Sequence, residues 1–175
     1  MVNQILSDPQ QGGTTYFQMI NALFLQSAVA QAHRNRIDIL VEQLKLATSQ
    51  AKALGRPVRV LNIGCGPAVE IERFLLGGGD PDSAHFTLVD FSEVTLEHTR
   101  EKMLAVGRQL GRPVQFQLVN DSVHNLLKRA TRADATDVNA AYDMAYCAGL
   151  FDYLSDKVCS RLLEYMHART RPGGQ

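Results

Sequence analysis

A short glycine-bearing segment, Gly64-Cys-Gly-Pro-Ala68, has the residue types of a ligand-binding loop. It follows a brief apolar stretch and precedes a stretch with helical spacing. Glycine lets the chain turn tightly and lets a ligand approach backbone atoms. Pro67 suits the first turn of a helix, where free amide groups can meet polar ligand atoms. The pattern predicts a small-molecule site at Gly64, Cys65 and Gly66, and a tight turn without a ligand is the alternative.

An acidic residue, Asp90, ends the next apolar stretch, and Phe91 follows it. A carboxylate in this position accepts hydrogen bonds from both hydroxyls of a ribose. An aromatic ring beside it can lie against an adenine face. The alternatives are an aspartate that merely flanks a helix and a phenylalanine that belongs to the core. With the glycine loop upstream, the sequence favours the ribose role for Asp90.

A polar triplet, Asn120-Asp121-Ser122, ends the third apolar stretch. A side-chain oxygen here can accept from an adenine amino group while a backbone amide serves a ring nitrogen. Capping of the following helix by Asp121 or Ser122 explains the triplet equally well.

The fourth apolar stretch leads into small residues and then into aromatic ones. Ala148 and Gly149 are small enough for a ligand to come close, whereas Cys147 fits a small buried hydrophobic position. Phe151, Asp152 and Tyr153 are candidates for the substrate side. Core packing is the alternative for each of them.

The elements that must position these residues alternate between helices and strands. Helical spacing runs from Thr14 to Lys52, as one long helix or two consecutive ones. The alternation predicts an α/β fold with a mostly parallel, Rossmann-like sheet, whose ligands bind at the carboxyl ends of the strands. The expected strands are 58–63, 85–90, 114–119 and 142–147, and the expected helices are 69–76, 92–107, 121–130 and 155–169.

The chain divides into a polar arm at 1–13, a helical cap at 14–54 and an α/β ligand-binding domain at 55–175, with a loop at 131–140. The net charge is zero, from 18 basic and 18 acidic residues, and no basic run is present, which argues against nucleic acid as a partner. Three scattered cysteines without a CxxC pair predict neither disulfides nor a metal site. No apolar stretch suggests a membrane span or a secretory signal, so we expect a cytoplasmic protein.

Two nucleotide-binding patterns fit the glycine loop poorly. A dinucleotide fingerprint needs a third small residue where this chain has Val69, and Pro67 occupies a position that is usually open. A phosphate-binding loop needs Gly-Lys followed by Ser or Thr, which is absent from the sequence. The loop therefore favours a ligand without a pyrophosphate.

Taken in order, the motifs resemble those of class I S-adenosylmethionine-dependent methyltransferases. The similar segments are 58–68, Leu-Val-Asp90, Asn120-Asp121, 142–146 and 171–174. The resemblance implies S-adenosylmethionine as cofactor, S-adenosylhomocysteine as product and methyl transfer to a small molecule as activity. It places Gly64 and Gly66 at the methionine part, Asp90 at the ribose, Phe91 and Asp121 at the adenine, and Cys147 and Ala148 near the sulfonium.

The chain departs from the family pattern in two ways. Asn62 stands where the first motif usually carries an acid, so we expect it to bind the cofactor by hydrogen bonds without a charge. The family sheet has seven strands, and the resemblance ends at the turn before the fifth. We therefore expect an incomplete sheet that a homodimer partner or a further C-terminal segment completes.

A narrower resemblance is to bacterial proteins for the biosynthesis of a 3-hydroxypalmitic acid methyl ester signal. It rests on residues 62–68 and on Cys147-Ala-Gly-Leu-Phe-Asp-Tyr-Leu154. It implies a fatty-acid carboxylate as acceptor. Tyr16 and other apolar residues of the N-terminal helices are candidates for lining the acceptor site, and simple packing of these helices on the sheet explains them equally well. The rival hypotheses are a methyltransferase-like binding or scaffold module without catalysis and, less favoured, an NAD-linked oxidoreductase.

Overall fold

The fold is an α/β arrangement in a computed structural model that describes residues 13–130 and 142–175. The predicted arm, apart from Gly13, and the predicted loop at 131–140 lie outside these residues. The helices are α2 (Thr15–Leu25), α3 (Ala28–Ala53), α4 (Val69–Leu76), α5 (Glu93–Leu110), α6 (Val123–Ala130) and α7 (Asp156–Arg169), with 3₁₀ turns η1 (Pro81–Ser83) and η3 (Phe151–Tyr153). The strands are β1 (Val58–Ile63), β2 (Ala84–Asp90), β3 (Gln115–Asn120) and β4 (Met144–Tyr146).

The four strands form one parallel sheet in the order β3-β2-β1-β4. β1 is buried along almost its whole length, as its run of Val, Leu and Ile predicts for a central parallel strand. The chain adds β2 and β3 on one side of β1 and then crosses to place β4 on the other side. The strand order therefore reverses at β1, and the loop after Ile63 lies at this switch point, where α/β proteins bind ligands.

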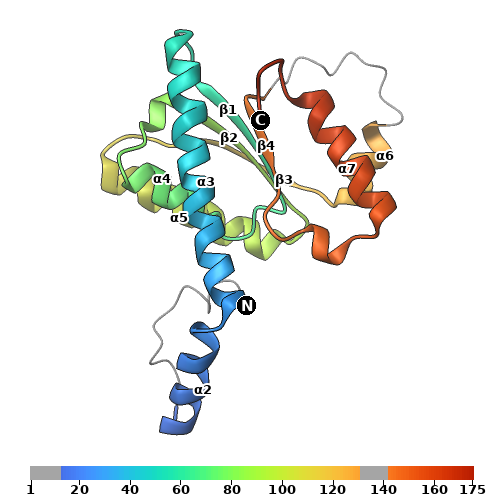
Figure 1. The fold of residues 1–175 in the computed structure, drawn as a ribbon. Helices are drawn as coiled ribbons and strands as arrows, with labels where there is room; N and C mark the ends of the chain where they lie inside the picture. The colour runs from blue at the N-terminus through green and yellow to red at the C-terminus, as the bar shows by residue number, and fades with distance from the viewer. Residues whose placement is uncertain (1–12, 131–141) are drawn as a thin grey trace.

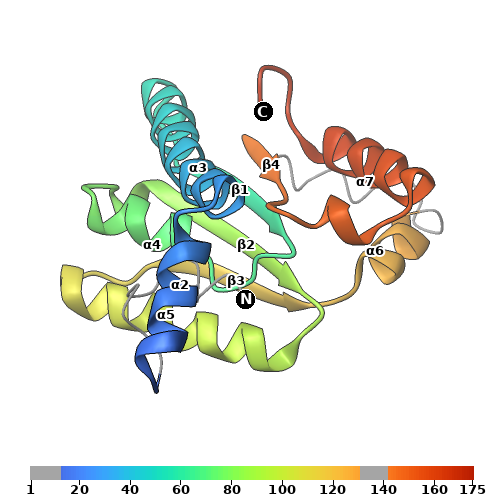
Figure 2. The ribbon, with the colours of Figure 1, turned by 60° about the horizontal axis from the view of Figure 1, so that its bottom comes forward.

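Helices cover both faces of the sheet (Figures 1 and 2). α3, α4 and α5 pack on one face around a core that includes Leu44, Ile71 and Met103, while α6 and α7 pack on the other with Leu126 and Leu162. α3 runs antiparallel to β1, so that its first turns lie beside the loop that follows β1, and α2 extends away from the body of the molecule (Figure 1). No helix among the described residues is both long and apolar enough to cross a membrane.

The predicted N-terminal helical segment is two helices. The break falls at Gln26 and Ser27, because the Ser27 hydroxyl accepts from the N–H of Ala30, 3.2 Å away, and so starts α3. α5 continues to Leu110, three residues beyond the predicted end, and stops at Gly111, which has a φ of +67°.

The predicted strand at 142–147 was too long, because only Met144–Tyr146 pair with β1. Tyr142 instead bridges to Thr170, and the chain leaves the sheet after Tyr146. Beyond β4, on the side away from β1, the N–H of Gln175 donates to the carbonyl of Asp143, and the N–H of Ala145 donates to Gln175, both over 2.8 Å. Gln175 thus bonds to β4 on both sides of Met144, as a residue of a neighbouring parallel strand does.

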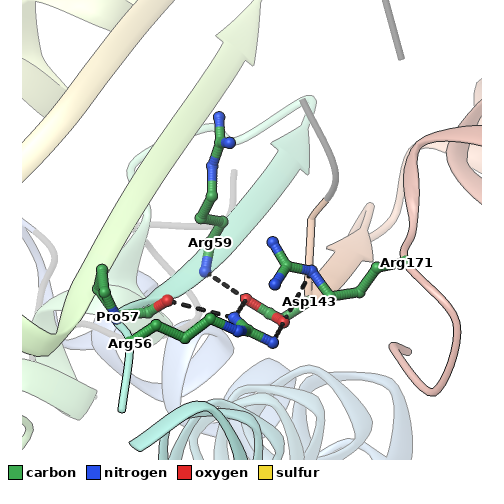
Figure 3. A network of polar contacts seen from close by, with 5 residues as sticks. All are labelled: Arg56, Pro57, Arg59, Asp143 and Arg171. Atoms are coloured by element: carbon green, nitrogen blue, oxygen red, sulfur yellow. Dashed lines mark hydrogen bonds and ion pairs between the residues drawn. The ribbon is translucent and has the colours of Figure 1, made fainter. Parts of the chain in front are cut away.

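At the amino ends of β1 and β4, a buried carboxylate joins three arginines (Figure 3). Asp143 accepts two hydrogen bonds from the guanidinium of Arg56, at 2.7 and 2.8 Å, and one from the backbone N–H of Arg59 at 2.8 Å. Nε of Arg171 lies 3.1 Å from the same carboxylate. This cluster lies at the edge of the sheet opposite the glycine loop, so it holds the strands in register and takes no part in the candidate site.

Candidate functional site

A cavity of about 110 Å³ lies at the carboxyl end of β1, between the glycine loop and α3. Four of the predicted site residues line it: Gly64, Cys65, Gly66 and Ala148. The remaining lining residues come from α3, from the end of the loop and from the start of α4, and they are His33, Arg36, Ile37, Leu40, Pro67, Ala68, Val69 and Glu70.

The loop holds its shape through backbone hydrogen bonds and left-handed residues. The N–H groups of Gly64 and Cys65 both donate to the carbonyl of Val89, at 2.8 and 3.0 Å, so the loop is tied to the end of β2. Gly64, Gly66 and Ala68 have φ values of +69°, +51° and +46°, and the two glycines meet this requirement without strain. Burial raises the pKa of the Cys65 thiol to about 12, with Asp90 and Glu70 adding to the shift, so Cys65 stays protonated and does not act as a nucleophile.

Asp90 connects this loop to the end of β2. Its Oδ2 accepts from the backbone N–H of Gly66 at 3.1 Å, and its Oδ1 accepts from that of Ser92 at 2.9 Å. On the other side of Gly66, the hydroxyl of Thr99 donates to the glycine carbonyl over 2.7 Å. A carboxylate has about four acceptor positions, so Asp90 retains capacity for a pair of ligand hydroxyls.

Phe91 and the polar triplet lie at the ends of β2 and β3. Phe91 is 77% exposed, which rules out the core alternative for this ring. The Asn120 amide donates to the carbonyl of Phe91 at 3.2 Å, while Asp121 accepts from the N–H of Ser122 and pairs with Arg129 of α6. The Ser122 hydroxyl accepts from the N–H of Asn125 at 3.2 Å, so the capping role expected for the triplet is present.

Asn62 lies in the core behind the cavity, within a network of buried polar groups. Its amide nitrogen donates to Oε1 of Glu70 at 2.9 Å and lies 3.1 Å from the hydroxyl of Tyr146, which itself donates to Oε1 of Glu70 at 2.8 Å. Among the described residues, nothing hydrogen-bonds the buried Oδ1 of Asn62. Burial raises the pKa of the Glu70 carboxyl, which favours its neutral form despite these donors.

The remaining predicted residues differ in how they relate to the cavity. Cys147 directly precedes Ala148 in the chain, and burial together with the nearby Cys159 raises the pKa of its thiol to about 11. Tyr16, Phe151 and Tyr153, the substrate-side candidates, do not line the cavity. Tyr16 and Tyr153 are 68% and 82% exposed, and Phe151 is exposed to a lesser degree.

The sequence analysis expected the N-terminal helices near the site, but it named neither the α3 residues that line the cavity nor Glu70. A signal was present, because His33, Arg36, Ile37 and Leu40 follow the i, i+3, i+4, i+7 spacing of one helix face. That face combines two basic residues with two apolar ones, which is typical of a helix that borders a polar site. Glu70 had no comparable signal, since its burial depends on contacts with Asn62 and Tyr146 of two separate strands.

The hydrogen-bond acceptors and the open space at this edge of the sheet fit an adenosyl cofactor. Asp90 has free acceptor capacity at the end of β2, and a Cβ built on Gly66 meets nothing within 4 Å, so the loop offers open space beside its backbone. The buried Oδ1 of Asn62 is a further acceptor without a donor among the described residues. The fold and the site together define a parallel α/β domain with a cavity at the carboxyl end of its first strand.

Comparison with known proteins identifies the family. The model of the methyltransferase domain family matches residues 60–174, and the chain belongs to this family, whose methyl donor is S-adenosylmethionine. No curated protein matches the chain significantly.

Solved structures share the fold at low identity. An arsenic(III) S-adenosylmethionine methyltransferase from Chlamydomonas reinhardtii is 22% identical over 68% of this chain and 37% of its own, with a TM-score of 0.51. A possible exported protein from Bordetella parapertussis is 18% identical over 98% of this chain and 50% of its own, with a TM-score of 0.65. A SAM-dependent methyltransferase from Agrobacterium tumefaciens is 15% identical over 75% and 40%, with a TM-score of 0.51. This chain thus spans half or less of the length of these structures.

Proposed function

We propose that the chain binds S-adenosylmethionine along the carboxyl ends of β1, β2 and β3 and transfers its methyl group to a small acceptor. The observation that supports this best is the double use of Asp90, which holds the glycine loop through Gly66 and keeps acceptor capacity for a ribose. S-adenosylmethionine supplies an electrophilic methyl group on a sulfonium. The residues proposed to hold it are Asn62, Gly64, Cys65, Gly66, Asp90, Phe91, Asn120, Asp121, Ser122, Cys147 and Ala148.

For Asp121, the proposal is limited by its ion pair with Arg129. A carboxylate that is paired in this way still has acceptor positions for an adenine amino group. Asn120 and Ser122 already make structural hydrogen bonds, so we expect the backbone N–H groups of this turn to contribute as much as the side chains.

For the acceptor, we propose a fatty-acid carboxylate that becomes a methyl ester. The cavity favours an apolar acceptor because Ile37, Leu40 and Ala148 line it. The neighbouring α2 adds exposed apolar residues, among them Tyr16, Phe17 and Leu23, and no charged residue lies between Pro9 and Ala32. A carboxylate is already ionised near neutral pH, so the reaction needs alignment and exclusion of water more than a strong base. The carboxylate oxygen forms a bond to the methyl carbon as the carbon–sulfur bond breaks, which leaves the neutral thioether S-adenosylhomocysteine.

The test is incubation of the chain with S-adenosylmethionine and a series of fatty acids, including 3-hydroxypalmitate, followed by mass spectrometry of methyl esters. We expect ester formation that depends on both substrates and increases with acyl-chain length. Calorimetric titration with S-adenosylhomocysteine, with NADH as control, tests the donor site separately. Saturable binding without turnover of any acceptor would favour the non-catalytic module, and binding of NADH alone would overturn the proposal.

A further inference from the structure

One cation of the cavity comes from outside the part of the chain that matches the family. Arg36 lies on α3, and the family match begins at residue 60. Its guanidinium lies against the turn after β4, since a Cβ built on Gly149 would lie 3.2 and 3.3 Å from Nη1 and Nη2. Arg36 therefore reaches from α3 to the residues that follow β4 and lines the cavity between them.

The guanidinium of Arg36 retains most of its hydrogen-bonding capacity. Its Nη2 donates to Nδ1 of His33 at 2.6 Å, so the proton of a neutral His33 ring is carried by Nε2. A guanidinium has five N–H donors, and this bond occupies one of them. Among residues 13–130 and 142–175, no carboxylate forms an ion pair with Arg36. The ion pairs within these ranges all join residues other than Arg36.

The carboxyl group among the residues that line the cavity compensates for this charge only weakly. Glu70 also lines the cavity, yet its carboxyl is buried and is engaged by Asn62 and Tyr146. Burial raises its pKa, which works against a negative charge at this position. The cavity therefore combines a partly buried guanidinium with apolar walls from Ile37, Leu40 and Ala148, and this combination favours an anion.

We propose that Arg36 is the carboxylate-binding residue of this site and that His33 holds its guanidinium in position. The planar fork of a guanidinium matches the two oxygens of a carboxylate, whereas a lysine offers only a point charge. The inference rests on the proposed function, because the donor and the acceptor proposed above each carry a carboxylate. The methionine end of the donor and the head group of a fatty acid are the two sources of this group.

The first experiment separates a carboxylate of the donor from the rest of the molecule. S-adenosylhomocysteine and 5′-methylthioadenosine share the adenosine thioether, but only the former has an amino-acid carboxylate. Calorimetry is done with the wild type, Arg36→Met and Arg36→Lys. Lys45→Met is the control, because Lys45 is an exposed cation on the same helix and pairs with Glu42 away from the cavity. If Arg36 binds the donor carboxylate, Arg36→Met weakens S-adenosylhomocysteine binding about ten- to a hundredfold and leaves methylthioadenosine unchanged. Arg36→Lys then recovers part of the loss.

The second experiment measures methyl transfer to decanoate by the same variants. If the acceptor carboxylate binds Arg36, Arg36→Met raises KM for decanoate about tenfold or more and leaves S-adenosylhomocysteine binding at the wild-type level. Either of these patterns supports the proposal and identifies the source. An equal loss of affinity for S-adenosylhomocysteine and methylthioadenosine would overturn the proposal, because Arg36 would then only shape the cavity. Wild-type behaviour of Arg36→Met in both experiments would overturn it as well.

A third measurement does not depend on adenosyl binding or turnover. The Nε–H resonance of Arg36, assigned by its loss in Arg36→Met, is followed by NMR during titration with decanoate and with decanol. A saturable shift with decanoate but not with decanol supports carboxylate binding by Arg36. This holds even if the wild type binds no adenosyl ligand, because the absence of adenosyl binding would count against the proposed function and not against the role of Arg36. If neither decanoate nor S-adenosylhomocysteine shifts the resonance, the carboxylate assignment is wrong.

Discussion

The backbone N–H of Gly66 donates to Oδ2 of Asp90 over 3.1 Å, so the end of β2 fixes the loop that follows β1. The two segments are adjacent because β1 and β2 pair in parallel up to Ile63 and Val89. One carboxylate thereby contributes to the shape of the loop and to the acceptors available at the sheet edge. Variants at these two positions must accordingly be read for both stability and binding.

We expect Asp90→Ala to weaken S-adenosylhomocysteine binding by about 1–3 kcal/mol, the cost of leaving buried hydroxyl groups without partners. The same change removes the acceptors of two backbone N–H groups, so a smaller loss of folding stability accompanies it. Calorimetry and urea unfolding measure the two effects. Glu97→Ala is the control, because Glu97 is an exposed acid of α5 that pairs with Arg100 of the same helix. Unchanged affinity in Asp90→Ala would contradict the ribose assignment.

Gly66→Ala separates the conformational requirement of the loop from its closeness to a ligand. A residue other than glycine at a φ of +51° costs about 1–2 kcal/mol of folding stability. Gly111→Ala is a matched control, since Gly111 has a φ of +67° and, like Gly66, open space at its Cβ, but caps α5 outside the cavity. We expect both variants to lose similar stability and only Gly66→Ala to lose cofactor affinity. Gly66→Val should abolish binding, and normal binding by it would mean that the loop is only a turn.

Phe91→Ala tests the adenine assignment with little risk to the fold, because the ring is 77% exposed. Loss of stacking on a base costs about 1 kcal/mol or more, so we expect a fivefold or larger rise in the Kd of S-adenosylhomocysteine. Folding stability should stay within about 0.5 kcal/mol of the wild type. Val94→Ala, an equally exposed apolar change on the next helix, should leave the Kd unchanged. A common Kd for the wild type and both variants would remove Phe91 from the site.

Local patterns were enough to predict the fold class and that the cavity lies at the carboxyl ends of the strands. Apolar runs with β-branched residues marked β1 and β2, and Ser92 marked the start of α5 through its bond to the N–H of Thr95. Element ends were less predictable. β4 has only three residues because Tyr142 pairs with Thr170, a contact that no local pattern reveals.

The site residues likewise divide into those set by local sequence and those set by contacts between distant segments. Gly64, Gly66 and Asp90 were predictable because their roles depend on their own backbone and on strand ends. Arg36 and Glu70 were missed, since the first reaches the cavity only through the packing of α3 on the sheet. The second reaches Asn62 and Tyr146, 8 and 76 residues away along the chain.

Glu70→Gln should change how folding stability depends on pH. Because burial raises the pKa of Glu70 in the folded state, the wild type gains protons on folding and loses stability as the pH rises above the ordinary glutamic acid pKa of 4.5. Glutamine stays neutral and can still accept from Asn62 and Tyr146, so the variant lacks this loss. We expect the unfolding free energy of the variant, relative to the wild type, to be higher at pH 8 than at pH 5. Urea titrations at the two pH values measure it, and a pH-independent difference would mean that Glu70 is not shifted.

Asp143→Asn addresses the opposite edge of the sheet and should affect stability without affecting binding. Burial by itself would raise the pKa of Asp143, but the guanidinium of Arg56, the N–H of Arg59 and the nearby Arg171 outweigh it and lower the pKa. The stabilisation from a lowered carboxyl pKa is present at neutral pH and is lost as the pH falls through the folded-state value, below the ordinary 3.8. We expect Asp143→Asn to cost about 3 kcal/mol at pH 7, the lower end for a broken buried pair because Arg56 stays partly hydrated. The cost should shrink toward pH 3.

The control for that variant is Arg112→Gln, which breaks ion pairs with Asp80 and Asp82 whose side chains are all substantially exposed. Exposed pairs contribute about 0–1 kcal/mol, so the control should unfold almost like the wild type. Because the Asp143 cluster lies at the amino ends of β1 and β4, the affinity of folded Asp143→Asn for S-adenosylhomocysteine should equal that of the wild type. A loss of affinity without a loss of stability would show that the two edges of the sheet are coupled through β1, and the division between a structural edge and a binding edge would then be wrong.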